Sequence, residues 1–210
     1  MDLQNQIESL FDGQSFEPAL FDSYPNKQRF KLSDGGATVE QLLFSLQKAH
    51  GILADIFADG SPLVVCLRTR SEDSLFSHRA LLSELYNAGI NISGRHSLWM
   101  SPVTHDERYD QSVEEWWFNL AFEVPLSSLH PLLWCTHASD FGSIRLRPVC
   151  TVYLFNIRSH VMVLPFDART MDVIGADQTL LASLRSKHTK HTQVHESCEP
   201  SIGILPDVDY

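Results

Sequence analysis

Three histidines and a cysteine near the C-terminal end have the residue types and spacing of a metal site. They follow one another at intervals of three, four and three residues: His188, His191, His195 and Cys198. On a helix they would roughly share one face, where imidazole and thiolate groups bind zinc, cobalt or nickel. Pro200 follows closely, however, and the surrounding sequence lacks an apolar stripe to support a helix. We therefore expect a solvated tail, with no metal and no cofactor.

A second set of reactive side chains lies around Cys135. His137 is two positions away and Asp140 follows, which are the residue types of a thiol nucleophile, its base and an orienting acid. Catalytic cysteines usually find their histidine across the fold rather than two residues along the chain. The chain also lacks the G-x-S-x-G, H-E-x-x-H, Walker and G-x-G-x-x-G patterns. The sequence thus predicts packing around Cys135 and no catalytic residue.

The densest charge in the chain lies between Thr104 and Glu115. This acidic segment has a net charge of -4, two fifths of the formal charge of -10, and Trp116 follows it directly. Acidic side chains around aromatic anchors are typical of a surface that steers and binds a basic protein. The alternative is a solvated loop between two strands, with the tryptophans divided between the faces of the sheet. For partner binding the sequence singles out Asp106, Glu107, Asp110, Glu114, Glu115 and Trp117.

The composition is that of a globular protein. The 210 residues are 43% hydrophobic and 20% charged, which allows one domain with a sizeable core. Net acidity disfavours a nucleic-acid partner, and four cysteines without a C-x-x-C pair are typical of reduced thiols. The N-terminus lacks the basic start of a signal peptide, and no apolar run reaches the roughly 18–20 residues of a membrane span. We expect a cytoplasmic protein without membrane contact.

Hydrophobic periodicity predicts the elements that position these residues. Helices are expected over 3–11, 38–57, 74–88, 127–138 and from 177, with a capping box of Thr38 and Gln41 and a loop over 14–27. Leu42, Leu43, Leu46, Leu53, Ile56 and Phe57 form the inward stripe of the second helix. Strands are expected over 29–32, 63–67, 96–103, 116–124, 149–157 and 161–164.

The order of these elements indicates the fold class. Helices lead and antiparallel strands follow, which predicts an α+β fold with a mainly antiparallel sheet packed against several helices. An open mixed α/β sheet is the alternative, because the apolar strand 63–67 lies between two helices. We expect residues 1–187 to form a single domain and residues 188–210 an irregular tail.

A stretch from Val163 to Gly175 has the pattern of a strand, a polar turn and a returning strand, and reads V-L-P-F-D-A-R-T-M-D-V-I-G. It is similar to the C-terminal signature of an uncharacterised bacterial family, known as a domain of unknown function. Thr170 stands where that family has glycine. Residues 28–32 and the helix from Thr38 resemble the family's N-terminal half, so the resemblance extends over about 25–175. It implies no reaction, cofactor or binding site.

The polar residues of this stretch have two interpretations. In the structural one, Asp167 and Arg169 pair across the turn and Asp172 caps or braces it. The apolar neighbours Met171 and Val173 then pack inward, with Ile174. In the functional one, the three polar residues line a site.

These observations favour a protein that binds another protein. The first hypothesis is a bacterial immunity protein that neutralises a cognate toxin, itself basic, by occluding its active or substrate-binding surface. The second is an enzyme of unknown reaction around Asp167, Arg169 and Asp172, which a deep pocket there would favour and a filled turn would disfavour. The third is a prophage-type DNA-binding regulator, for which the chain offers only small basic groups at 145–147 and 187–190.

Overall fold

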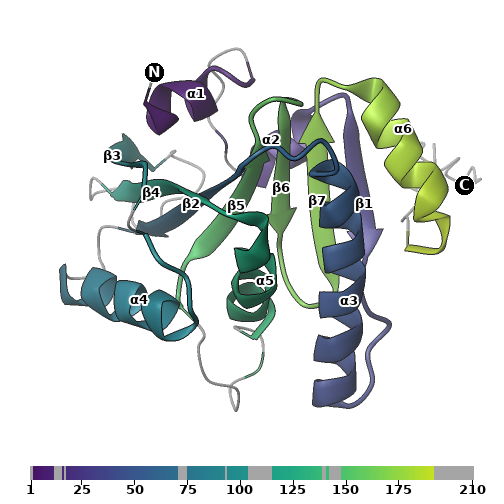
Figure 1. Cartoon of the computed structure of the whole chain (residues 1–210), viewed down its shortest axis with the longest axis horizontal. Helices are drawn as coiled ribbons and strands as arrows, with labels where there is room; N and C mark the ends of the chain where they lie inside the picture. The colour runs from purple at the N-terminus through teal and green to yellow at the C-terminus, as the bar shows by residue number, and fades with distance from the viewer. Residues whose placement is uncertain are drawn as a thin grey trace, which may run out of the picture.

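The fold is seen in a computed structural model that describes residues 2–11, 16, 18–70, 75–92, 94–103, 115–138, 141 and 148–191. A seven-stranded sheet has the order β1-β7-β6-β5-β2-β4-β3 (Figure 1). Its strands are β1 (Lys27–Lys31), β2 (Leu63–Arg70), β3 (His96–Pro102), β4 (Trp116–Val124), β5 (Thr151–Asn156), β6 (Val161–Pro165) and β7 (Thr170–Gly175). The helices are α1 (Leu3–Glu8), α2 (Pro18–Ser23), α3 (Thr38–Ile56), α4 (Leu75–Asn87), α5 (Leu129–Ala138) and α6 (Gln178–Lys187), with short 3-10 turns at Leu126–Ser128 and Thr189–His191.

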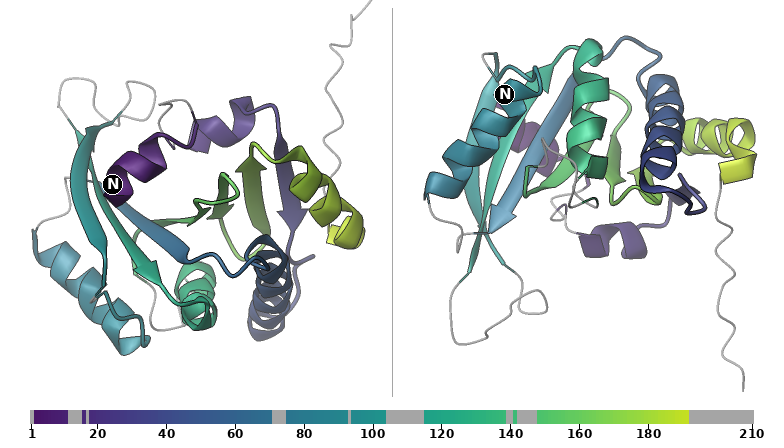
Figure 2. Two further views of the ribbon diagram at one scale, coloured as in Figure 1. Left: turned by 45° about the horizontal axis from the view of Figure 1, so that its top comes forward. Right: turned by 90° about the horizontal axis from the view of Figure 1, so that it is seen from below.

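Helices cover both faces of the sheet (Figure 2). α3, α4, α5 and α6 lie over one face, and α1 and α2 lie over the other. Each face has its own buried apolar cluster, since strand side chains alternate between the two faces. Every pair of neighbouring strands is antiparallel. The predicted α+β fold with an antiparallel sheet is therefore confirmed, and the open mixed sheet does not form.

The apolar run at 63–67 is a central strand, as predicted. β2 lies between β4 and β5, and its residues from Leu63 to Thr69 are buried. The strand continues to Arg70, beyond the apolar run, because Arg68 and Thr69 still pair with β4. This extension brings two arginines to the end of the sheet where β4 begins.

Three local predictions are wrong. The expected loop over 14–27 contains α2, in which Pro18 takes the first helical position, where the missing N–H costs nothing. The expected capping box at Thr38 does not form, because Thr38 is already helical and the N-cap position belongs to Ala37, which has no side-chain acceptor. Leu43, assigned to the inward stripe of α3, is 57% exposed.

Other local signals act as predicted. Gly89 ends α4 with a φ of 82°, and the next amide, of Ile90, donates to the carbonyl of Leu85 at 2.9 Å. Asp177 caps α6 by accepting from the amides of Thr179 and Leu180. None of the helices in the described part of the chain is long and apolar enough to cross a membrane.

Candidate functional site

The acidic segment connects the edge strand β3 with its neighbour β4. The amide of Val103 donates to the carbonyl of Glu115 at 3.0 Å, directly beyond the paired residues Pro102 and Trp116. The segment therefore leaves and rejoins the sheet at one point, the end of the β3–β4 hairpin. Four of the residues singled out for partner binding lie outside the described residues: Asp106, Glu107, Asp110 and Glu114.

Glu115 and Trp117 anchor the base of this segment. Glu115 is 3% exposed, and its carboxylate accepts a hydrogen bond from Arg70 at 3.0 Å. The Trp117 ring is half-buried beneath two guanidinium groups, with Arg68 at 4.5 Å and Arg70 at 5.0 Å from its centroid. Glu115 is thus an internal ion-pair partner rather than a surface charge, and Trp116 points to the opposite face of the sheet.

That opposite face carries an apolar groove between the outer strands and α4. Its volume is about 450 Å³, and its floor includes Leu67 of β2, Phe118 and Leu120 of β4 and Leu98 of β3. Leu81 and Leu82 of α4 form a wall. The size and apolar lining are those of a binding site rather than of a packing defect.

Large apolar side chains are exposed at the groove, and Met100 is exposed next to it, opposite the lining residue Phe118. Leu98 is 68% exposed, Met100 is 50% exposed and Leu82 is 41% exposed. β3 is an edge strand of the sheet, so no strand among the described residues pairs with its outer side. The sequence predicts a strand here, but it carries apolar residues on both faces, with Trp99 buried on the other one. Periodicity alone therefore could not identify Leu98 and Met100 as surface residues.

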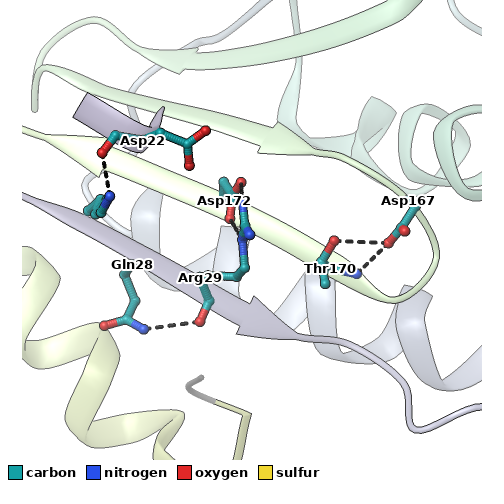
Figure 3. Close-up of polar contacts among 7 residues, drawn as sticks. Asp22, Gln28, Arg29, Asp167, Thr170 and Asp172 are labelled. Atoms are coloured by element: carbon teal, nitrogen blue, oxygen red, sulfur yellow. Dashed lines mark hydrogen bonds and ion pairs between the residues drawn. The ribbon is translucent and has the colours of Figure 1, made fainter. Parts of the chain in front are cut away.

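The second candidate, the turn between β6 and β7, is held by one carboxylate (Figure 3). Asp167 accepts hydrogen bonds from the amide of Thr170 at 2.6 Å and from the Thr170 hydroxyl at 3.0 Å. It also accepts a hydrogen bond from the amide of Arg169 at 2.7 Å. The Arg169 guanidinium lies 3.2 Å from the same carboxylate. The predicted pairing of Asp167 with Arg169 is confirmed, and Thr170 supplies a further donor through its hydroxyl group.

Asp172 does not cap or brace the turn, which corrects the prediction. Its two oxygens accept hydrogen bonds from Nε and Nη2 of Arg29, both at 2.6 Å (Figure 3). Arg29 is its directly paired residue on β1, so both side chains lie on one face of the sheet. The hydrogen bond to Asp172 raises the pKa of Arg29, although burial of the guanidinium opposes this.

The space around this ion pair is filled. The hollow between α2, β1 and Asp172 has a volume of about 10 Å³, which holds at most one water molecule. The apolar neighbours Met171, Val173 and Ile174 are buried, as predicted. The hollow leaves little room for a substrate beside Asp172, which counts against the enzyme hypothesis at this residue.

The Cys135 region is also unsuited to nucleophilic chemistry. Burial raises the pKa of the Cys135 thiol to about 11 and lowers the pKa of His137 to about 4, against the opposing charge of Asp167. Near neutral pH the thiol is protonated and the imidazole is neutral, whereas an activated cysteine needs a thiolate. Both side chains are buried in α5, and Asp140 lies outside the described residues.

The first of the C-terminal histidines has a protein partner. His188 Nε2 lies 2.9 Å from the carboxylate of Asp55, which also accepts from Lys187 at 3.0 Å. The side chain of His191 lies outside the described part, as do His195 and Cys198. Among the side chains that the structure places, no group of three or more His, Cys, Asp or Glu is arranged to hold a metal.

The fold and these sites define an α+β protein with a filled polar turn and an open apolar groove beside an acidic connection. The chain belongs to the family described as Domain of unknown function (DUF3885), whose model matches residues 3–192. The resemblance to a family of unknown function is confirmed at that level. No curated protein matches the chain. No solved structure matches it either.

Proposed function

We propose that the protein binds and neutralises another protein, as an immunity protein does for a cognate toxin. The observation that carries this proposal is the exposed apolar groove on the outer hairpin. Contiguous apolar surface rimmed by charge is typical of protein-binding sites. Leu98 and Met100 are exposed, so their side chains contribute little hydrophobic stabilisation to the folded protein alone. Burial against a partner would account for apolar residues at these positions.

Charge supplies the second part of the proposal. The acidic segment begins where the hairpin ends, and its sequence contains Asp106, Glu107, Asp110 and Glu114 against a single Arg108. A negative field beside an apolar patch accelerates the approach of a basic partner and disfavours acidic ones. We propose that the toxin surface held here is its active or substrate-binding surface.

The competing functions have less support. The filled hollow beside Asp172 leaves little room for a substrate. For DNA binding, Lys187 of the basic group at 187–190 is paired with Asp55, and the net charge of -10 repels a phosphate backbone.

The proposal is tested by capture and neutralisation. The tagged protein is used to capture its partner from the native host at low and moderate salt, and the partner is identified by mass spectrometry. The captured gene is then expressed alone and together with this protein. We expect a stoichiometric basic protein that arrests growth when expressed alone and is tolerated on co-expression. If no stoichiometric partner is retained, or if co-expression gives no protection, the proposed function is wrong.

Charge reversal tests the acidic segment. The variant Asp106→Lys, Glu107→Lys, Asp110→Lys should bind the captured partner more weakly and lose most of the salt dependence of its association rate. The exposed pair Arg95–Glu123 belongs to the same hairpin and provides the control, Glu123→Lys. Unchanged affinity in the triple variant would remove the acidic segment from the binding surface.

A further inference from the structure

The two edges of the sheet differ in charge. β1 forms one edge and β3 forms the other (Figure 1). β3 has no Asp, Glu, Lys or Arg among its seven residues, whereas β1 has three basic side chains among its five residues: Lys27, Arg29 and Lys31. Charged side chains on an edge strand, lysine above all, hinder its pairing with another chain. β1 has this protection and β3 lacks it.

The backbone of β3 directs hydrogen-bonding groups away from the sheet. The amide of Val103 donates to the carbonyl of Glu115, and the amide of Glu123 donates to the carbonyl of Arg95. In an antiparallel pair every second residue bonds the partner strand, and the register of β3 with β4 has no bulge. The odd-numbered residues of β3 therefore bond β4. The outward backbone groups belong to the even-numbered residues: His96, Leu98, Met100 and, through its carbonyl alone, Pro102.

We infer that β3 pairs antiparallel with β3 of a second copy of this chain, about a two-fold axis at Trp99. Trp99 is the middle residue of β3, so this axis lets the two strands overlap along their whole length. Leu98 then lies opposite Met100 of the second copy, and their amides and carbonyls bond reciprocally. His96 lies opposite Pro102 of the second copy, so the N–H that proline lacks is missed only at the ends of the ladder. The dimer has the closed symmetry that is commonest among homo-oligomers.

Charge explains why a second copy fits β3 and does not fit β1. Like charges directly opposite each other destabilise a strand pair. A two-fold axis at Arg29, the middle residue of β1, would place Arg29 opposite itself and Lys27 opposite Lys31. The axis at β3 places no two charged side chains opposite each other. Arg95, directly before β3, is already paired with Glu123 of the same copy. The described residues of this edge therefore favour an uncharged strand, which β3 itself provides.

Strand pairing leaves the groove accessible. Hydrogen bonds between strands lie in the plane of the sheet, whereas the side chains of Leu98 and Met100 stand on its face. The groove between α4 and β3 lies on that face, so the dimer carries one groove on each side of the two-fold axis. Dimer formation goes beyond the proposed function and does not depend on it.

Sedimentation velocity at several protein concentrations measures the self-association. An interface built mainly on one strand pair is small, so we expect a dimer with a dissociation constant of about 10–100 µM. Hydrogen exchange followed by mass spectrometry then locates the contact. Peptides that contain the outward amides of β3 should exchange about threefold more slowly at a concentration tenfold above the dissociation constant than at one tenfold below it.

Variants at Met100 test the pairing directly. Met100→Lys gives β3 the kind of charge that β1 carries, and Met100→Pro removes an outward N–H from each copy. Each change should weaken the dimer by about tenfold or more. The side chain of Met100 is 50% exposed and its amide points away from β4, so both variants should remain folded. The matched control is Leu43→Lys on α3, where Leu43 and Phe44 form a different exposed apolar surface. That variant should dimerise like the unmodified protein.

Several results would overturn the dimer. These are a protein that stays monomeric at about 1 mM, a folded Met100 variant that dimerises with undiminished affinity, equal weakening by the control, and protection from exchange that appears elsewhere but not at β3. A monomer whose β3 amides become protected only when a captured protein is added would overturn it in favour of strand addition by that protein. Capture and neutralisation of a toxin are measured separately and can succeed when the protein is monomeric.

Discussion

Replacing His137 with leucine gives a sharp test of how the α5 region is packed. The side chain is fully buried, and neither ring nitrogen has a hydrogen-bond partner among the described residues. Burial lowers the pKa of this histidine from 6.5 to about 4, so the ring is neutral near neutral pH. A leucine of similar volume removes two unpaired polar atoms from the interior. The free energy of unfolding at about pH 7.5 should therefore fall by less than about 1.5 kcal/mol, or rise.

The size of the burial effect at His137 follows from the dependence of the free energy of unfolding on pH below neutrality. The unfolded chain takes up a proton at His137 near pH 6.5, whereas the folded chain resists protonation down to about pH 4. Between these values the unfolded state binds more protons, so this group's contribution to stability is full above pH 6.5 and is lost as the pH falls. At about 1.4 kcal/mol per pH unit, the loss reaches about 2 kcal/mol by about pH 5 and about 3 kcal/mol by about pH 4.

Urea unfolding of both proteins at about pH 7.5 and about pH 5 measures this difference. The unmodified protein should lose about 2 kcal/mol more than His137→Leu between the two conditions. Contributions from His50, whose pKa is also lowered by burial, are common to both proteins and cancel. Equal losses in the two proteins, or a variant that is several kcal/mol less stable near neutral pH, would contradict this prediction.

Three further changes test other contacts. Asp167→Ala removes the acceptor for two backbone amides and the Thr170 hydroxyl, and should cost about 2–4 kcal/mol in urea unfolding, whereas Asp167→Asn should cost less. Gly175→Ala places a Cβ 2.9 Å from Cγ2 of Val161 and 3.1 Å from a backbone carbonyl oxygen, and should cost about 1–3 kcal/mol by the same assay. Burial raises the pKa of the Cys135 thiol to about 11, so at about pH 8 this thiol should resist iodoacetamide in the folded protein and react with it in urea. Peptide mapping by mass spectrometry measures the labelling, and rapid labelling of the native protein would contradict the burial of Cys135.

Local sequence signals predicted much of the fold. The alternating run from Trp116 to Val124 is β4 with the same boundaries, and the apolar run from Leu63 is the central strand. Gly89 and Asp177 mark helix ends as their chemistry requires. These signals succeed because they depend on the backbone within a few residues. Asp167 and Arg169 are only two positions apart, so their pairing also depends on nearby residues.

Contacts between residues far apart in the chain could not be predicted from the sequence. The partner of Asp172 is Arg29, 143 residues away, and only the pairing of β1 with β7 brings them together. Glu115 was grouped with the surface acids of its segment, yet Arg70 of a different strand pairs with it in the interior. The groove depends on which face of β3 is covered, and a strand with apolar residues on both faces does not reveal this.

The most direct test of partner binding compares capture by three proteins from the same host lysate. The unmodified protein, Leu98→Gln and the matched control Leu43→Gln are immobilised at equal density, and the retained proteins are quantified by mass spectrometry. We expect one stoichiometric basic protein, retained by the unmodified protein and the control and depleted about tenfold or more on Leu98→Gln. Retention of no stoichiometric protein, or equal retention on all three, would contradict the claim that this groove binds a partner.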